Sequence, residues 1–554
     1  MNEILIRQRN DRQGTLLKQS TIIRIVLRAV VTILLLALLA RILTFPLAHD
    51  EQIHIAAAKL VFDAPLYRTL GYNHLPGLPR LLGTIYALTG TTHLVLVGRL
   101  LIFACWLATG AVLLWMAHRA GAGRAIGALA CLLLAATPLI GPAGMLVTNN
   151  FLPIPFALVS VQCVICAFAV TGPASRKGRI GWAVGSGACA TAAVMLKISF
   201  VALLPPLAVA MLLAPLGETR GVRLRQIIVP AVLGAGLALL PFLPDVLRDP
   251  VATYIHTVRY FVGPHHDYWQ QAPGPKAMSL ADKVLVAEHV WLSGGALLAG
   301  LLAGAIGWIG RSLRAREAWP LALLAAITGS FAMISLAPTP AFPQYYIPAV
   351  PFVVMFLVVG YGRLAAPAAA RVEPFLVVAG VLALVMIVPR LGALPALLRP
   401  QDWTGLAIHR DAMRMRDAMT AIAGSHAGIA TLSPIRALEA GIDPYPEFAG
   451  GPFVYRVARF IPASERHAYR TTSAADLTRF LDARRPAAIL TGDEPALDPP
   501  FINYARARGY RPVAIGDPAV RLFVLPNHGS GALPLSSSDS RIRLTLQPSR
   551  SVRS

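Results

Sequence analysis

Long apolar windows alternate with short polar connections over the first 395 residues of the chain. A helix that crosses a membrane needs about 20 mostly apolar residues. Two of the windows, on either side of Lys197, are short, and Pro205 interrupts the second. The pattern predicts an all-α polytopic membrane protein of about 11 spans. The predicted spans are 22–45, 93–117, 125–142, 152–171, 180–196, 199–215, 227–247, 289–309, 318–337, 345–362 and 374–395.

Composition and charge support this prediction. Of the 554 residues, 56% are hydrophobic and only 14% are charged, and the mean hydropathy is +0.60, which is far from the composition of a soluble domain. The formal net charge is +23. Lys and Arg concentrate in the amino-terminal segment and in alternate short loops, as the positive-inside rule requires of cytoplasmic loops. The positive charge is therefore explained by the orientation of the spans in the membrane, and it gives no support to nucleic-acid binding.

The same distribution predicts the organisation of the chain. Residues 1–21 are expected to be a cytoplasmic amino terminus and 22–395 the transmembrane domain, with long polar outer loops at 46–92 and 248–288. Residues 400–526 read as a small extracytoplasmic α/β domain. Its expected helices lie near 404–424, 473–484 and 499–509, and its expected strands at 429–432, 487–490, 513–515 and 520–525. The Ser- and Arg-rich stretch 527–554 is expected to be disordered.

The first outer loop carries the most informative side chains. Residues 48–60 read as a short helix along the membrane surface, in which His54 lies one turn from Asp50 and Glu51. A carboxylate at the lipid boundary is costly unless it is paired or used. Acids also favour the first turn of any helix, so a solvated helix start is the alternative explanation.

The sequence here resembles the GT-C superfamily of membrane glycosyltransferases, in particular family 39-like enzymes. This group includes protein O-mannosyltransferases, lipid A aminoarabinose transferases and lipopolysaccharide-core transferases. The resemblance rests on the acidic pair after the first span, on Pro65-Leu66-Tyr67 and the Pro-rich re-entry, and on Arg99, Lys197 and Gln344-Tyr345-Tyr346. It implies transfer of a sugar from a polyprenyl-phosphate donor to a glycan, lipid or protein acceptor, by inversion, at the outer face of the cytoplasmic membrane.

The resemblance also implies roles for individual residues. Asp50 is the expected catalytic base and Glu51 its catalytic neighbour, with Glu51 or His54 tuning the base and His54 also expected to bind substrate. Lys197 and Arg259 are candidates to hold the donor phosphate. Four aromatic residues are expected to line the substrate site: Tyr67, His74, Tyr345 and Tyr346. Thr148-Asn149-Asn150 stands where many relatives have a second acid, so no metal site is assigned. The acidic pair is compatible with a divalent cation or with none.

Plainer explanations exist for several of these residues. Lys197 could be a lysine that snorkels to the interface, and Arg99 a structural anchor. The polar cluster at His256, His265, His266 and Asp267 is explained by an interfacial loop better than by a metal site. Two other functions stay open. A secondary transporter would need ionisable residues near the bilayer midplane, and a non-catalytic scaffold would bind a partner through the C-terminal domain.

Overall fold

The computed structural model describes residues 25–169, 176–215, 218–274, 276–423 and 428–526. The expectations for the amino terminus and for the tail 527–554 lie outside these residues. Within them, eight helices are long and apolar enough to cross a membrane, and three shorter apolar helices accompany them. Together they correspond one for one to the eleven predicted spans. The chain is therefore a polytopic, mostly helical membrane protein, as its apolar windows predict.

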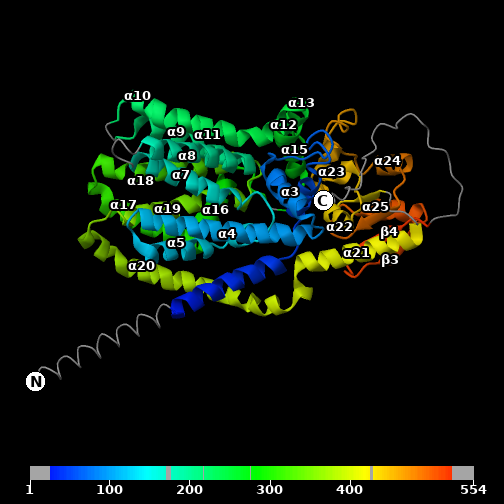
Figure 1. The fold of residues 1–554 in the computed structure, drawn as a ribbon. Helices are drawn as coiled ribbons and strands as arrows, with labels where there is room; N and C mark the ends of the chain where they lie inside the picture. Colours follow the sequence, from blue (N-terminus) through cyan, green and yellow to red (C-terminus); the bar gives the residue numbers. More distant parts are fainter. Residues whose placement is uncertain (1–24, 170–175, 216–217, 275, 424–427, 527–554) are drawn as a thin grey trace, which may run out of the picture.

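The helices of this bundle lie roughly side by side (Figure 1). The first covers Ile25–Thr44. The next are α4 (Leu94–Arg119), α5 (Gly123–Ala135), α6 (Ile140–Ala143), α7 (Pro153–Ala169), α8 (Arg176–Leu196), η2 (Ile198–Leu203), α9 (Leu204–Leu213), α10 (Arg220–Arg223), η3 (Leu224–Ile228), α11 (Val229–Leu239), η4 (Leu240–Phe242) and α12 (Leu243–Leu247). The last are α17 (Gly294–Ile309), η6 (Gly310–Ser312), α18 (Ala315–Ser335), η7 (Pro343–Tyr345), η8 (Ile347–Ala349), α19 (Val350–Tyr361), α20 (Ala366–Ile387) and η9 (Val388–Leu398).

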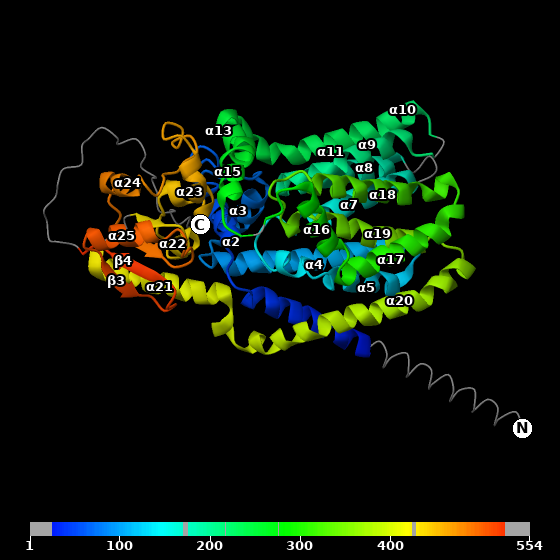
Figure 2. The same cartoon turned by 180° about the vertical axis from the view of Figure 1, so that it is seen from behind.

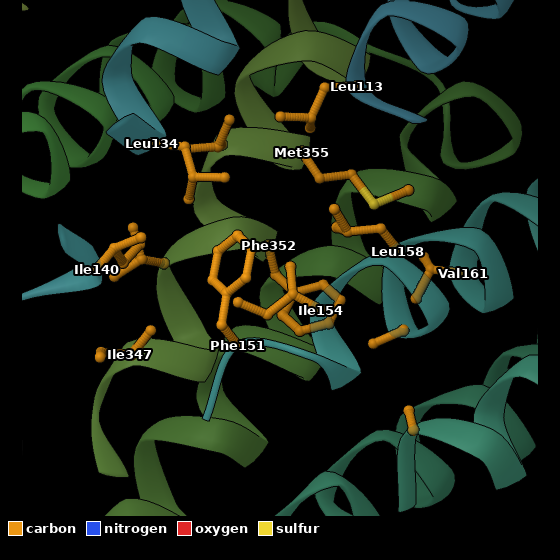
Figure 3. Packing of buried hydrophobic residues seen from close by; sticks show 14 of the residues in the cluster. Leu113, Leu134, Ile140, Phe151, Ile154, Leu158, Val161, Ile347, Phe352 and Met355 are labelled. Carbon is orange, nitrogen blue, oxygen red and sulfur yellow. The ribbon is translucent and has the colours of Figure 1, made fainter. Parts of the chain in front are cut away.

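The bundle has a continuous apolar interior. Figure 3 shows Phe151 and Phe352 packed among Ile154, Leu158 and Met355, all of which are buried. On the opposite faces of the helices, large apolar side chains such as those of Val232, Leu237 and Val377 are exposed. A soluble protein rarely exposes so much apolar surface, so these faces fit a lipid environment.

Two long connections fold at one end of the bundle. The first, residues 46–92, contains α2 (His49–Leu60) and α3 (Gly77–Thr89). The second, residues 248–288, contains α13 (Pro250–Tyr254), η5 (Ile255–Arg259), α14 (Tyr260–Val262), α15 (Pro264–Gln271) and most of α16 (Leu280–Trp291). The predicted surface helix is thus present as α2, and most of its residues are buried.

The C-terminal α/β domain, residues 400–526, lies beyond the same end of the bundle (Figures 1 and 2). Its elements are η10 (Pro400–Asp402), α21 (Thr404–Ala423), β1 (Ile429–Thr431), α22 (Pro434–Glu439), η11 (Pro446–Phe448), α23 (Pro452–Val457), η12 (Ala458–Phe460), α24 (Leu477–Ala483), β2 (Ala488–Thr491), α25 (Pro499–Ala507), β3 (Arg511–Ala514) and β4 (Arg521–Val524). The strands form one sheet in the order β1-β2-β4-β3, in which β1 and β2 are parallel and the other pairs antiparallel.

Both faces of this sheet are covered, because successive side chains of a strand point to opposite faces. In β1, Ile429 packs with Met415 of α21, while its neighbour Ala430 packs with Leu481 of α24 and Phe501 of α25. At β1 the sheet therefore lies between helices, while the edge strand β3 is mostly exposed. The short apolar runs of this region predict the strands.

Candidate active site

Asp50 and Glu51 are adjacent in α2 but lie in different surroundings. Successive side chains of a helix point about 100° apart. One carboxylate of an adjacent pair can therefore face the interior of the bundle while the other faces the end of the bundle. The Asp50 side chain keeps 34% of its surface exposed, whereas that of Glu51 has none. The two predicted acids thus cannot have the same role.

Glu51 is held by a full set of hydrogen bonds. Its carboxylate accepts from Nε and Nη2 of Arg99 at 2.8 and 2.6 Å and from the backbone N–H of Val147 at 2.9 Å. Arg99 also donates to the Ile42 and Pro46 carbonyl oxygens, and its side chain is buried. Both groups are satisfied by each other and by the backbone. This arrangement favours the anchor interpretation of Arg99 and makes Glu51 its structural partner.

Among the described residues, the Asp50 carboxylate contacts one side chain as a hydrogen-bond partner, the imidazole of the adjacent residue His49. The His49 Nε2 atom lies 3.1 Å from an Asp50 carboxylate oxygen. Burial by itself raises the pKa of Asp50, but the hydrogen bond and charge of His49, together with the charge of Arg456, bring it below its ordinary value. Asp50 is therefore an ionised carboxylate at neutral pH, as a base must be.

His54 and His74 form one wall beside Asp50. The two imidazoles stack with their centroids 5.0 Å apart, and the His54 Nδ1 atom lies 3.0 Å from the Tyr72 hydroxyl oxygen. Burial, with the charge of His74, lowers the pKa of His54 well below its usual range. Burial also lowers that of His74, to about 4. Both rings are neutral at physiological pH and provide hydrogen-bonding groups without charge.

Lys197 belongs to the helix bundle and directly follows the last residue of α8. Its Nζ donates to the Asn150 Oδ1 atom at 2.7 Å and lies 5.5 Å from the centre of the Tyr345 ring. The charge of Asp50 acts on both Lys197 and Tyr345. Burial lowers the pKa of Lys197 to about 7, against the opposing effect of the Asp50 charge, and among the described residues no carboxylate forms an ion pair with it. A bound anion would favour the charged form of this lysine. The amide at Asn150, which replaces an expected acid, is thus part of the site.

The remaining predicted site residues are Tyr67, Arg259 and Tyr346, and each makes different contacts. Tyr67 is buried and donates from its hydroxyl to the His74 carbonyl oxygen at 3.0 Å, so it shapes the loop. Arg259 pairs with Glu465 of the C-terminal domain at 2.7 Å, and its side chain is 47% exposed. Tyr346 is fully buried among apolar residues, unlike its neighbour Tyr345.

Sequence reasoning missed the residues that the C-terminal domain brings to this end. Arg456 and Glu494 both lie close enough to His49 for their charges to act on it. No motif signals them, since hundreds of residues separate them from α2. A hollow of about 370 Å³ on this domain is lined by Arg466, Arg470 and Asp476, among others, and includes none of the predicted site residues.

Within the described part of the chain, no group of three or more His, Cys, Asp or Glu side chains is placed to hold a metal ion. Two histidines of the polar cluster in the second connection have partners within α15, whereas both ring nitrogens of His256 are buried without a hydrogen-bond partner among the described residues. The Trp269 indole donates to the His265 Nε2 atom at 3.0 Å, and His266 Nε2 lies 2.8 Å from the Gln270 amide nitrogen.

One protein family matches part of the chain. The family model for dolichyl-phosphate-mannose-protein mannosyltransferase matches residues 73–247, which is less than half of the chain. No curated protein matches the sequence.

Two crystal structures share the fold. Both are of ArnT from Cupriavidus metallidurans. The structure bound to undecaprenyl phosphate is 15% identical, with a TM-score of 0.61, over 92% of this chain and 99% of that one. The apo structure is 14% identical, with a TM-score of 0.59, over 90% and 97% of the two chains. The chain therefore has the fold of ArnT, and the family-model match over residues 73–247 agrees with the resemblance to the GT-C membrane glycosyltransferases.

Proposed function

We propose that this protein transfers a sugar from a polyprenyl-phosphate donor to an acceptor hydroxyl at the outer face of the cytoplasmic membrane. One observation carries the proposal: the ionised Asp50 lies near Lys197, a buried lysine whose side chain donates its one described hydrogen bond to the Asn150 amide oxygen. A base and an unpaired cation are the two groups that such a transfer needs. ArnT, which has this fold, binds undecaprenyl phosphate.

The reaction follows from these two charges as a single displacement. Asp50 takes the proton of the acceptor hydroxyl while the acceptor oxygen forms a bond to the anomeric carbon. The bond from that carbon to the phosphate oxygen breaks, and its electron pair stays on the polyprenyl phosphate. Lys197 stabilises the charge that develops on this leaving group. Attack from the face opposite the leaving group inverts the configuration of the sugar.

The test is sugar transfer by the Asp50→Asn protein in lipid, with labelled undecaprenyl-phosphate sugars as donors. Loss of the base is expected to reduce turnover by about 10²- to 10⁴-fold, the range that general-base catalysis supplies. Asp63→Asn is the matched control, because Asp63 lies in the same loop, is exposed and has no described side-chain partner. Near-normal turnover by Asp50→Asn would remove Asp50 from the mechanism.

The same assay separates the proposal from the two other functions. A secondary transporter or a non-catalytic scaffold releases no undecaprenyl phosphate from any of the labelled donors. The transporter has less support in the structure, because α2, which carries Asp50, lies at one end of the bundle (Figure 2). The scaffold would also retain its partner after the Asp50→Asn substitution, whereas the transferase would lose turnover.

A further inference from the structure

His49 lies between the candidate base and the C-terminal domain. Its Nε2 atom is 3.1 Å from Asp50, and its ring centre is 5.7 Å from that of Phe453 in α23. The side chain is 54% exposed, so packing within α2 does not fix it. The two contacts that hold the ring come from Asp50 on one side and from the C-terminal domain on the other.

Phe453 also packs against Arg456, which is surrounded by aromatic rings. The Arg456 guanidinium carbon lies 4.8 Å from the Phe453 ring centre, 5.5 Å from that of Tyr268 and 5.4 Å from that of Trp269. Within the described residues, Arg456 forms no ion pair with a carboxylate, and its Nε atom is buried without a hydrogen-bond partner. Cation–π contacts therefore orient this charge and leave it unneutralised beside His49.

The C-terminal domain also brings an acid to the same place. Glu494 follows β2, and its Oε1 atom is buried without a hydrogen-bond partner among the described residues. A buried polar atom without a partner is costly and calls for an explanation. The charged groups that act on His49 are Asp50 of its own helix, Arg456 of α23 and Glu494. Asp50 and Glu494 favour the protonated imidazole, and Arg456 opposes it.

We propose that His49 is a positioning residue for Asp50, and that the C-terminal domain sets its place and charge through Phe453, Arg456 and Glu494. Protonated His49 donates from Nε2 to one oxygen of the Asp50 carboxylate and so leaves the other oxygen directed at the acceptor hydroxyl. The inference rests on the proposed function, since the orientation of Asp50 matters only if it is the base. It gives the C-terminal domain a part in the reaction centre.

The experiment measures the ionisation of His49 without any substrate. Diethylpyrocarbonate modifies neutral imidazole, so the extent of His49 modification against pH, read by peptide mass spectrometry of the full-length protein in lipid, reports its protonation. Burial raises the pKa of Glu494 to about 7, so its negative charge acts on His49 in the upper part of the curve, and loss of that charge in Glu494→Gln is expected to shift the curve to lower pH there. Asp50→Asn is expected to shift it in the same direction. Asp417→Asn, an exposed position of α21 in the same domain, should leave it unchanged.

The second measurement is the pH profile of sugar transfer from labelled undecaprenyl-phosphate donors. Because the protonated imidazole positions the base, activity should fall as pH rises through the pKa of His49, and this alkaline limb should move to lower pH in Glu494→Gln. If neither the modification curve nor the limb moves in Glu494→Gln while Asp50→Asn shifts the curve, the inference is wrong. Active Asp50→Asn protein would instead overturn the proposed function, whatever the modification of His49 shows.

Discussion

Glu51 and Arg99 show how a charged pair is stabilised inside an apolar bundle. Arg99 of α4 donates to Glu51 of α2 and to backbone oxygens at the end of the first helix. Glu51 also accepts from the backbone before α7. One ion pair thus joins four segments of the chain. Because each charge is fully desolvated, removal of one leaves the other buried and unpaired.

The stability of three variants is expected to reflect this buried ion pair. Glu51→Ala and Arg99→Ala should each destabilise the protein by about 3–5 kcal/mol, and the double variant should cost less than the sum of the two. Denaturant unfolding in micelles provides the three free energies. If Glu51→Ala kept its stability and lost only turnover, Glu51 would be a site residue after all, as the sequence suggested.

Among the helices, α8 places the candidate phosphate-binding lysine. Lys197 follows its last residue, so the position of Lys197 depends on how α8 packs. A Cβ atom built on Gly187 of α8 would lie 1.8 Å from the Ala231 carbonyl oxygen of α11, and one on Gly234 of α11 would lie 2.1 Å from the Val184 carbonyl oxygen. Small residues at such contacts let two helices in a membrane approach closely.

Substitution of the contact glycine is therefore predicted to separate the two helices. Gly187→Ala should lower stability by about 1–3 kcal/mol, since neither backbone can yield easily. Gly181→Ala in the same helix is the matched control, because nothing lies within 4 Å of its Cβ position. Thermal unfolding in one detergent compares the two, and equal melting temperatures would contradict the close packing.

For the molecule as a whole, Glu439 joins the C-terminal domain to the bundle. It is fully buried, and its carboxylate accepts from the backbone N–H of Val95 in α4 at 2.9 Å and lies 3.1 Å from His409 Nδ1. Nearby, the Ile435 N–H donates to the Gln52 side chain of α2 at 3.2 Å. Burial raises the pKa of Glu439 to about 8. The junction thus contains a carboxyl group that titrates near neutrality.

The raised pKa of Glu439 determines the direction in which stability changes with pH. The folded protein binds the Glu439 proton more tightly than the unfolded chain, so the contribution to stability is complete below the ordinary glutamate pKa and is lost as pH rises through about 8. The melting temperature should therefore fall as pH rises from the ordinary glutamate pKa to about 8 and level off above it, and Glu439→Gln should flatten this dependence. Glu465→Gln, which is partly exposed, should not. A Glu439→Gln protein with the native pH dependence would rule out this group.

Much of the architecture could be predicted from the chain alone. The eleven apolar windows match helices in the described residues, and the runs at 429–432 and 520–525 match strands β1 and β4. Within α2, the spacing that joins His54 to Asp50 also holds, because both residues belong to one helix. The helix spacing could not separate the roles of Asp50 and Glu51, since the separation depends on which face of α2 meets Arg99.

The sequence by itself determined the membrane spans, the central sheet and the presence of acids at the end of the first span. The length of an apolar run and the alternation of apolar and polar residues are local properties, and they directly determine how a segment interacts with solvent or lipid. Only the tertiary structure decided that Glu51 is neutralised and Asp50 is not, that Tyr345 and not Tyr346 lies beside Lys197, and that Phe453, Arg456 and Glu494 lie near His49. Those outcomes depend on contacts between segments far apart in the chain, which no local pattern encodes.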